Sequence, residues 1–347
     1  MDYVTLGTSD LKVSTLCLGS MSWGSKNTEA EGHAQIDRSL DAGINFIDTA
    51  EMYPTYPVLK DTTGRTEEII GTWVAASGRR DDVVIATKVA GKNGGFLRDG
   101  AGYDGQVMID AVETSLTRLQ TDVIDLYQLH WPMRPHYHFR NHWTWDPSGQ
   151  NKAEIEAAML GVLQAMDQLV KAGKVRAFGL SNETTWGTAA WLRLAEAHSL
   201  PRMVSIQNEY SLMCRHADTD LAELCAFEDV GLLPFTPLVA GMMSASHGPD
   251  KIPPGTRRSR DESVGGRVND RMWAAAAAYR DIAERHGLDV NQMALAWTVS
   301  RPFVASSIFG ASSMDQLETA LGAADLVLSD EVLHEIDIVH RAHPMPF

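Results

Sequence analysis

Short apolar runs alternate with longer amphipathic segments along most of the chain. The runs are four to eight residues long and predict buried strands at residues 15–18, 44–48, 83–88, 123–130, 175–180, 203–207, 231–235 and 305–309. The segments between them predict helices at residues 30–42, 66–76, 106–119, 154–171, 184–198, 219–229, 272–286 and 313–322. Eight strand–helix pairs predict an α/β fold of the (β/α)8 type, also called a TIM barrel.

Several segments lie outside this repeat. Residues 4–7 and 11–13 flank the turn Thr8-Ser9-Asp10, which predicts an N-terminal β-hairpin. We expect an additional helix at 290–300 and a C-terminal extra helix at 330–341. Because no composition shift or Pro/Gly-rich linker divides the chain, residues 1–347 are expected to form a single barrel domain. Two connections, 131–152 and 244–271, are long enough to suggest a function of their own.

Composition narrows the range of partners. The chain has 347 residues, of which 30 are Lys or Arg and 45 are Asp or Glu, giving a formal net charge of −15. Such a charge repels a phosphate backbone, so we expect no nucleic-acid partner, and local groups must hold any bound phosphate. The three cysteines lack paired spacing, the start lacks a signal-peptide pattern, and no apolar run is long enough for a bilayer. These features predict a cytoplasmic protein without a membrane partner.

Four polar side chains fall at or just past the ends of predicted strands: Asp48, Tyr53, Lys88 and His130. In α/β barrels the carboxyl ends of the strands meet at one rim, where the chemistry takes place. A tyrosine hydroxyl has a pKa of about 10, and a neighbouring ammonium group favours the phenolate form. We therefore expect Lys88, oriented by Asp48, to tune Tyr53 as a proton donor. His130 would then donate a hydrogen bond to a substrate oxygen.

Each of these residues also has an ordinary structural interpretation. Asp48 could cap the turn that follows it, and Tyr53 could be an aromatic of the rim. Lys88 could be a solvated strand end, and His130 a structural histidine. Their combination at three strand ends favours the catalytic interpretation.

Six ordered segments resemble those of the aldo-keto reductases. The segments similar to that family's active site are Asp48-Thr49-Ala50-Glu51-Met52-Tyr53, Thr87-Lys88 and Gln128-Leu129-His130-Trp131-Pro132. Those similar to its cofactor site are Gly179-Leu180-Ser181-Asn182-Glu183, Ile206-Gln207-Asn208-Glu209-Tyr210-Ser211-Leu212 and Gly310-Ala311-Ser312-Ser313-Met314-Asp315-Gln316-Leu317. The resemblance spans Leu6 to His340, and the tyrosine segment is most similar to that of the bacterial Tas-type members.

The resemblance implies an NAD(P)H-dependent oxidoreductase that reduces aldehydes or ketones to alcohols, with NADPH favoured over NADH. Tyr53 would be the general acid, Lys88 and Asp48 its tuning pair, and His130 the group that orients the carbonyl. The implied cofactor residues are Ser181, Asn182 and Gln207 at the carboxamide, Tyr210 stacked on the nicotinamide ring, Thr236, Pro237, Leu238 and Gly241 at the pyrophosphate, and Gly310, Ser312 and Gln316 at the adenosine phosphate. Trp23 and Trp131 would lie beside a small-molecule carbonyl substrate, whose choice would depend on the loop 131–152, Tyr56 and the residues after Leu328.

The residues themselves support part of this picture. No Gly-x-Gly-x-x-Gly segment follows a predicted strand, which excludes a Rossmann-type site. Gly310-Ala311-Ser312-Ser313 instead follows the last predicted strand and opens a helix, where backbone N–H groups can bind phosphate. An ordinary turn with a serine N-cap is the alternative.

Two positions depart from the pattern of the family. Ala245-Ser246-His247 stands where a lysine-containing segment is usual, and Ala320 stands where an asparagine is usual. No arginine is present in 312–316 to grip a 2′-phosphate. We take as a hypothesis that an arginine of the preceding loop compensates; the candidates are Arg257, Arg258, Arg260 and Arg267.

Two other function classes compete with this interpretation. His136, His138 and His142 are spaced like metal ligands and would suit a metal-dependent hydrolase. They lie in a loop rich in tryptophan rather than on rigid strand ends, so we expect no metal and a role in lining the substrate pocket. A cofactor-binding regulatory subunit with little turnover is the second alternative, and measured turnover separates it from an enzyme.

Overall fold

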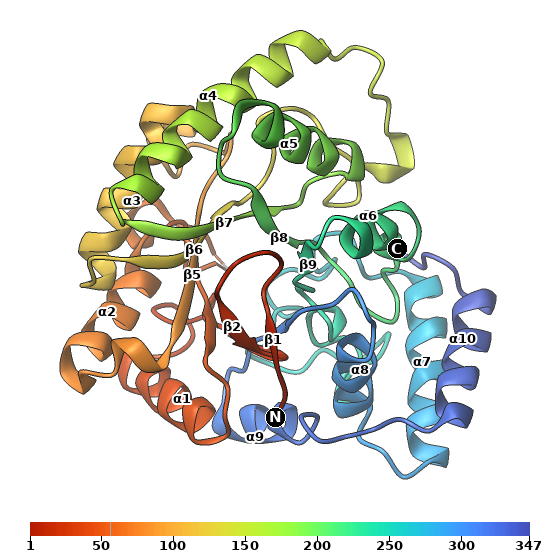
Figure 1. Cartoon of the computed structure of the whole chain (residues 1–347). Coiled ribbons are helices and arrows are strands. Elements are labelled where there is room, and N and C mark those ends of the chain that lie inside the picture. Colours follow the sequence, from red (N-terminus) through yellow and green to blue (C-terminus); the bar gives the residue numbers. More distant parts are fainter. Residues whose placement is uncertain (56) are drawn as a thin grey trace.

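Eight parallel strands form the centre of the computed structural model, which describes residues 1–55 and 57–347 (Figure 1). The strands are β3 (Leu16–Gly19), β4 (Phe46–Asp48), β5 (Val84–Val89), β6 (Ile124–Leu129), β7 (Val175–Ser181), β8 (Met203–Gln207), β9 (Gly231–Leu232) and β10 (Ser307–Phe309). They are hydrogen-bonded in the order β10-β3-β4-β5-β6-β7-β8-β9. This order confirms the predicted (β/α)8 barrel and each of its eight strands.

The barrel closes between β9 and β10, where the pairing is incomplete. Isolated bridges join Leu232 to Val304 and Phe235 to Ile308 in place of a continuous ladder. The predicted strand at 231–235 is therefore shorter in the structure. Pro234 has no N–H group to donate, and Thr236 has a φ of 58°, which ends the extended conformation.

Helices surround the sheet at the predicted positions. They are α1 (Glu29–Asp41), α2 (Arg65–Ser77), α3 (Gly105–Leu119), α4 (Lys152–Lys171), α5 (Thr185–His198), α6 (Asp220–Phe227), α7 (Asp270–Arg285) and α9 (Met314–Leu321). The additional helices are α8 (Val290–Val299) and α10 (Asp330–Ala342), and α10 lies beside α7 (Figure 1). Side-chain caps begin many of them, for example the capping box in which Thr28 and Glu31 exchange hydrogen bonds at α1.

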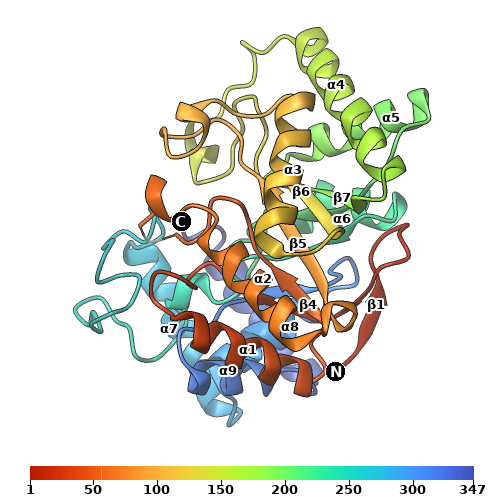
Figure 2. The same ribbon diagram turned by 90° about the vertical axis from the view of Figure 1, so that its left-hand side faces the viewer.

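The N-terminal hairpin closes one end of the barrel. It consists of β1 (Tyr3–Thr5) and β2 (Lys12–Ser14), which pair antiparallel as predicted. Leu6, Leu11 and Val13 of the hairpin pack against apolar side chains of the strands in one buried cluster. The two long connections lie at the opposite end of the barrel, so that end is the one left for a functional site (Figure 2).

The barrel interior is apolar near the hairpin and polar at the other end. Side chains of a strand alternate between its two faces, so every second residue points inward. On β5 the inward positions read Val84, Ala86 and Lys88, with Val84 and Ala86 in the same cluster as the hairpin. A side chain at Gly179 on β7 would place its Cβ 2.3 Å from the Ser205 hydroxyl, so the interior is too narrow there for anything larger than glycine.

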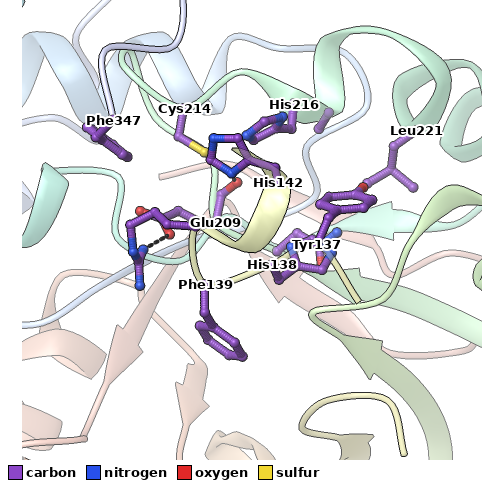
Figure 3. A pocket seen from close by; sticks show the side chains of 12 residues that line it. Tyr137, His138, Phe139, His142, Glu209, Cys214, His216, Leu221 and Phe347 are labelled. Atoms are coloured by element: carbon purple, nitrogen blue, oxygen red, sulfur yellow. Dashed lines mark hydrogen bonds and ion pairs between the residues drawn. The ribbon is translucent and has the colours of Figure 1, made fainter. Parts of the chain in front are cut away.

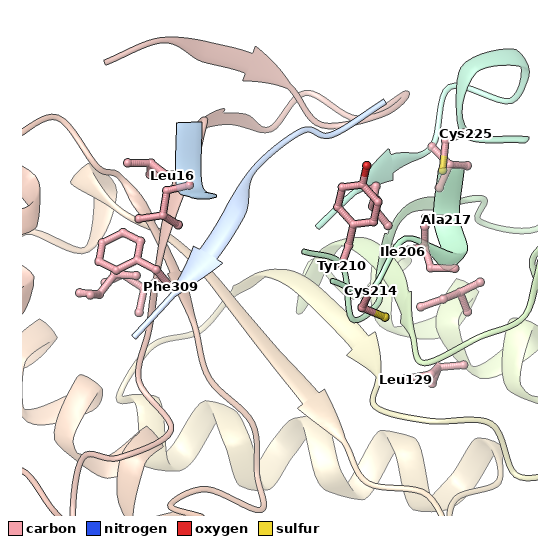
Figure 4. Close-up of a cluster of buried hydrophobic side chains, with 14 of the residues drawn as sticks. Leu16, Leu129, Ile206, Tyr210, Cys214, Ala217, Cys225 and Phe309 are labelled. Atoms are coloured by element: carbon pink, nitrogen blue, oxygen red, sulfur yellow. The ribbon is translucent and has the colours of Figure 1, made fainter. Parts of the chain in front are cut away.

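A second and larger apolar cluster lies between the sheet and the helices. It includes Leu16 and Phe309 on the neighbouring strands β3 and β10, and Ile206 on β8 (Figure 4). All three have relative exposures of 2% or less. The two clusters hold the strands from both faces, which fixes the strand ends on which the polar residues stand.

Candidate functional site

The four residues predicted at the strand ends lie together inside the open end of the barrel. Lys88 is fully buried, and its Nζ donates to Asp48 Oδ2 at 2.7 Å and to the Thr49 carbonyl at 2.7 Å. The same Nζ lies 5.2 Å from the centroid of the Tyr53 ring. The Tyr53 and His130 rings meet edge to face with their centroids 5.8 Å apart. The phenol therefore lies next to both the ammonium and the imidazole.

Two glutamines complete the surroundings of Asp48. Gln207 Nε2 donates to Asp48 Oδ1 at 2.8 Å, and Gln128 Nε2 reaches the same oxygen at 3.3 Å. Asp48 is 3% exposed, so its carboxylate is held almost entirely by Lys88 and these two amides. A buried charge of this type is tolerated only when it is paired and hydrogen-bonded, and both conditions are met here.

Burial changes the protonation of both basic groups. It lowers the pKa of Lys88, and the Asp48 carboxylate opposes this change. Burial also lowers the pKa of His130 well below its usual value, and the nearby charge of Lys88 lowers it further. His130 is therefore a neutral imidazole at pH 7, with one donor and one acceptor nitrogen. Within residues 1–55 and 57–347 its Nδ1 has no hydrogen-bond partner, which leaves bonding capacity at this position.

The residues implied to hold a carboxamide lie next to this group. Ser181 Oγ donates to the Gln207 carbonyl at 2.9 Å, and Asn182 Nδ2 donates to the His130 carbonyl at 2.9 Å. Asn182 has a φ of 50°, an uncommon conformation that turns its side chain across the ends of β6 and β7. Its buried Oδ1 has no hydrogen-bond partner in the described part of the chain. A buried acceptor without a partner is suited to an N–H donor from a ligand.

Tyr210 is placed differently from the expectation that it stacks on a nicotinamide ring. It has no exposed surface, its ring stacks on Trp297 at 5.3 Å, and its hydroxyl donates to Asp218. The ring thus has no face open to a ligand, and Tyr210 is corrected to a residue of the outer core. Phe235, which sequence reasoning did not single out, is half-buried at the end of β9. The signal that could have found it is the aromatic residue that closes the apolar run 231–235.

The turn after β9 contains the four residues implied at the pyrophosphate: Thr236, Pro237, Leu238 and Gly241. Thr236, Val239, Ala240 and Gly241 all have positive φ angles. Leu238 has a φ of −98° and Val239 one of 50°, a right-handed to left-handed step of the kind found in anion-binding turns. The N–H groups of Val239 and Gly241 donate to the carbonyls of Thr236 and Leu238 within this turn.

Gly310, Ser312 and Gln316 lie at the start of α9. Gln316 Oε1 accepts from both the N–H and the hydroxyl of Ser312, at 2.9 Å each, while Ser313 caps the helix. Lys26 was not predicted as a site residue, yet its Nζ donates to Ser312 Oγ at 2.9 Å. The two residues are 286 positions apart, so no local sequence signal could have joined them.

The four candidate arginines of the loop 244–271 form two groups: Arg258 and Arg267 stabilise the loop, whereas Arg260 and Arg257 lie near residues 21–26. Arg258 donates to the carbonyls of Gly248 and Pro249, so it holds the loop itself, and Arg267 forms a two-pronged ion pair with Glu209 at 2.7 and 2.9 Å. Arg260 is close enough to Lys26 to lower the pKa of that ammonium, after burial, which has the larger effect. Arg257 donates to the Met21 sulfur at 3.4 Å.

Trp23 and Trp131, the residues implied beside the substrate, lie at different depths. Trp23 has no exposed surface, and its Nε1 donates to Gln35 at 2.9 Å. Trp131 is partly exposed and stacks at an angle on His130, with their centroids 4.7 Å apart. Trp131 is therefore the one of the two that can contact a molecule at the barrel mouth. Tyr56, also named as a specificity residue, lies outside the described residues.

Two histidines of the loop 131–152, His138 and His142, line a small pocket under the loop (Figure 3). His142 packs against His216 at 4.7 Å, and His138 Nε2 bonds to the Glu183 carbonyl at 2.9 Å. Across residues 1–55 and 57–347, one group of three possible ligand atoms lies within 4.8 Å of one another, and it consists of His286, Glu331 and Glu335. That group is on the outer helices, and Arg285 already binds Glu335 there at 2.6 Å.

No helix within the described ranges is long and apolar enough to cross a membrane.

Comparison with known proteins places these observations in a family. The model of the aldo/keto reductase family matches residues 15–341. Protein tas of Escherichia coli (strain K12) is 42% identical over 350 residues, covering 100% of this chain and 99% of that protein. The uncharacterized oxidoreductase YrpG of Bacillus subtilis (strain 168) is 30% identical, covering 97% and 95%. The norsolorinic acid reductase stcV of Emericella nidulans is 28% identical, covering 94% and 78%.

Proposed function

The chain belongs to the aldo/keto reductase family, and on this premise we propose that it is an oxidoreductase that uses NADPH to reduce aldehydes or ketones to alcohols. The observation that carries the proposal is the buried Lys88–Asp48 pair beside Tyr53 and the neutral His130. The relatives include proteins named as an oxidoreductase and a reductase, which agrees with this class of reaction.

Tyr53 supplies the proton in the proposed reaction. Reduction of a carbonyl adds a hydride to carbon and a proton to oxygen, and bound NADPH would supply the hydride. Lys88 stabilises the negative charge left on the Tyr53 oxygen, because its ammonium lies 5.2 Å from the ring centroid and is kept in place by Asp48. His130 donates to the carbonyl oxygen through its protonated ring nitrogen and so holds the oxygen next to Tyr53.

The chain offers groups that fit a nicotinamide cofactor. The unpartnered Asn182 Oδ1 suits the N–H₂ of the carboxamide, with Ser181 and Gln207 beside it. Phe235 replaces Tyr210 in our proposal as the aromatic ring for the nicotinamide, because its side chain is partly exposed whereas that of Tyr210 is fully buried. The turn with Thr236, Pro237, Leu238 and Gly241 would take the pyrophosphate.

The adenosine phosphate would lie at the start of α9. Gly310, Ser312 and Gln316 lie there, where the Ser312 N–H and hydroxyl donate to Gln316, and Lys26 adds an ammonium that bonds Ser312. Because the molecule carries a net charge of −15, an ammonium with Arg260 close to it is a local exception that favours a phosphorylated ribose, and hence NADPH over NADH.

Substitution of the proposed acid tests the function. We expect Tyr53→Phe to lower kcat for carbonyl reduction by about 100-fold or more, since general acid catalysis of this type contributes about 10²–10⁴-fold. The Kd for NADPH should stay within about twofold, because the hydroxyl acts in the transition state. The kcat is measured by NADPH oxidation with a panel of small aldehydes, α-dicarbonyls and aromatic ketones. The Kd for NADPH is measured by fluorescence titration.

Tyr137→Phe is the matched control, since it removes the same hydroxyl from the pocket under the loop. Full activity of Tyr53→Phe would refute the assigned acid. Tight NADPH binding by the unmodified protein without turnover of any carbonyl would instead favour the regulatory-subunit alternative.

A further inference from the structure

A row of aromatic rings leads outward from the proposed catalytic residues. The Tyr53 ring meets His130, the His130 ring meets Trp131 at 4.7 Å, and the Trp131 ring meets Phe139 edge to face at 6.4 Å. Trp131 is fixed in this row, because its Nε1 donates to the Lys92 carbonyl at 2.9 Å. A Cβ at Gly91 would lie 2.5 Å from the indole, so the ring packs directly on the backbone there. The row ends at Phe139.

Phe139 is held in an exposed position by its two neighbours. It is 44% exposed and has a φ of 58°, and Arg140 follows with a φ of 66°. Two successive non-glycine residues in this region are unfavourable unless the surroundings impose them, and such strain concentrates at functional sites. His138 bonds the Glu183 carbonyl at 2.9 Å, and Arg140 pairs with Glu209 at 3.1 Å. These anchors on both sides impose the conformation.

The other exposed aromatics near this loop have different surroundings. Arg271 covers the ring of Trp143 at 5.0 Å, and Arg134 covers that of Trp186 at 5.3 Å. The ring contacts of Phe139 are instead with Trp131 and with His136 at 5.7 Å. Phe139 is one of the residues that line the pocket under the loop, and its ring points away from the other labelled side chains there (Figure 3). The ring therefore keeps exposed surface next to its contact with Trp131.

The rings of the row favour a flat, aromatic ligand. Aromatic side chains bind an aromatic ring by offset or edge-to-face contact and by apolar area. The charged groups closest along the chain are engaged in ion pairs, since Glu183 binds Arg134, and Glu209 binds both Arg140 and Arg267.

We propose that Phe139, together with Trp131, forms the wall that binds the aromatic ring of an aryl-substituted aldehyde or ketone. Phe139 is thus a specificity-determining residue, and the preferred substrates carry a phenyl or larger aromatic group a few bonds from the carbonyl. This inference rests on the proposed carbonyl reduction at Tyr53.

The test compares two aldehydes that differ by one phenyl group, 3-phenylpropanal and propanal, with NADPH and the full chain. Phe139→Ala is expected to lower kcat/KM for 3-phenylpropanal at least fivefold, mainly through KM, and to leave propanal within twofold. Phe139→Tyr should restore the preference. Trp143→Ala, a control in the same loop with 54% exposure, should leave the ratio unchanged. An unchanged ratio in Phe139→Ala, or an equal loss in Trp143→Ala, would overturn the inference.

A binding measurement separates this inference from the proposed reaction. Calorimetric titration of the NADPH-saturated protein with 3-phenylpropan-1-ol needs no turnover, and Phe139→Ala should weaken the Kd at least fivefold. If the unmodified protein reduced neither aldehyde, but Phe139→Ala still weakened the binding of 3-phenylpropan-1-ol at least fivefold, the proposed function would be wrong and the aromatic wall would stand. Equal Kd values for the unmodified protein and for Phe139→Ala would refute the aromatic wall.

Discussion

Lys26 contacts a turn that is far from it in the sequence. It follows β3, whereas Ser312 follows β10, and the two strands are neighbours in the barrel. Lys26 is exposed, and its partial desolvation and the proximity of Arg260 lower its pKa. A phosphate dianion bound next to the Lys26 ammonium would raise the pKa of Lys26 again, because a neighbouring negative charge favours the charged form of a lysine.

At this scale we predict the effect of Lys26→Ala on cofactor choice. The KM for NADPH should rise about tenfold, corresponding to about 1.4 kcal/mol, while that for NADH changes less than twofold. Steady-state kinetics with both cofactors measures this. Lys251→Ala, which removes an exposed lysine from the loop 244–271, controls for the general loss of positive charge. Equal changes for the two cofactors would place the 2′-phosphate elsewhere.

Three of the predicted site residues lie at strand ends, as the sequence predicts. Asp48, Lys88 and His130 stand at strand ends, where the period of a strand and the barrel count determine both position and direction. Tyr210 and Phe235 each follow an apolar run, and their direction depends on how the chain leaves the strand. Tyr210 points outward to Trp297, and no periodic pattern in the sequence predicts this direction.

Among the elements, the two long loops are joined to each other at Glu209. This residue follows β8, and its carboxylate binds Arg140 of the loop 131–152 at 3.1 Å and Arg267 of the loop 244–271 at 2.7 Å. The side chains are at most 16% exposed. Neutralising Glu209 removes the carboxylate that two largely buried guanidinium groups share, which is more costly than losing a surface pair.

We therefore predict that Glu209→Gln loosens both loops together. Amide hydrogen exchange in 136–142 and 257–267 should become on the order of tenfold faster, equivalent to about 1.4 kcal/mol of local opening free energy. Mass spectrometry of exchanged peptides reads this directly, and the exposed Glu262→Gln in the same loop serves as the control. Faster exchange in only one of the two loops would show that Glu209 does not couple them.

The order and type of the elements could be predicted because each has a period of its own and a recognisable end. The eight strands, the hairpin and the two additional helices all appear where the pattern places them. The path of the long loops could not be predicted. It depends on pairs such as Arg267 and Glu209, which are 58 residues apart and leave no periodic signal.

For the whole molecule, the histidines make stability depend on pH. Burial is the first cause of a lowered pKa at seven of them: His130, His136, His138, His142, His216, His247 and His340. The pKa of His138 falls to about 3. The unfolded chain takes up these protons near pH 6.5, whereas the folded chain does not, so stability is present above pH 6.5 and is lost as the pH falls below it.

We predict that the free energy of unfolding falls by at least about 2 kcal/mol between pH 7.5 and 5.5, since each group that stays neutral contributes up to about 1.4 kcal/mol per pH unit. Urea denaturation at the two pH values measures this. His138→Asn keeps a donor for the Glu183 carbonyl and should reduce the fall by about 1 kcal/mol. The exposed His198→Asn should show the same fall as the unmodified protein. Greater stability at pH 5.5 would contradict the sign.

The seam between β9 and β10 has a consequence for how the barrel responds to a bound molecule. The turn after β9 and the turn that begins α9 lie on the two sides of this seam, which two isolated bridges hold together. The pairing there is shorter than that of β5 with β6 or of β6 with β7, so the seam is a weak joint of the barrel. A dinucleotide whose phosphates engaged both turns would act as a cross-link over that joint. Binding of the dinucleotide would then stabilise the closed barrel as well as supply the hydride.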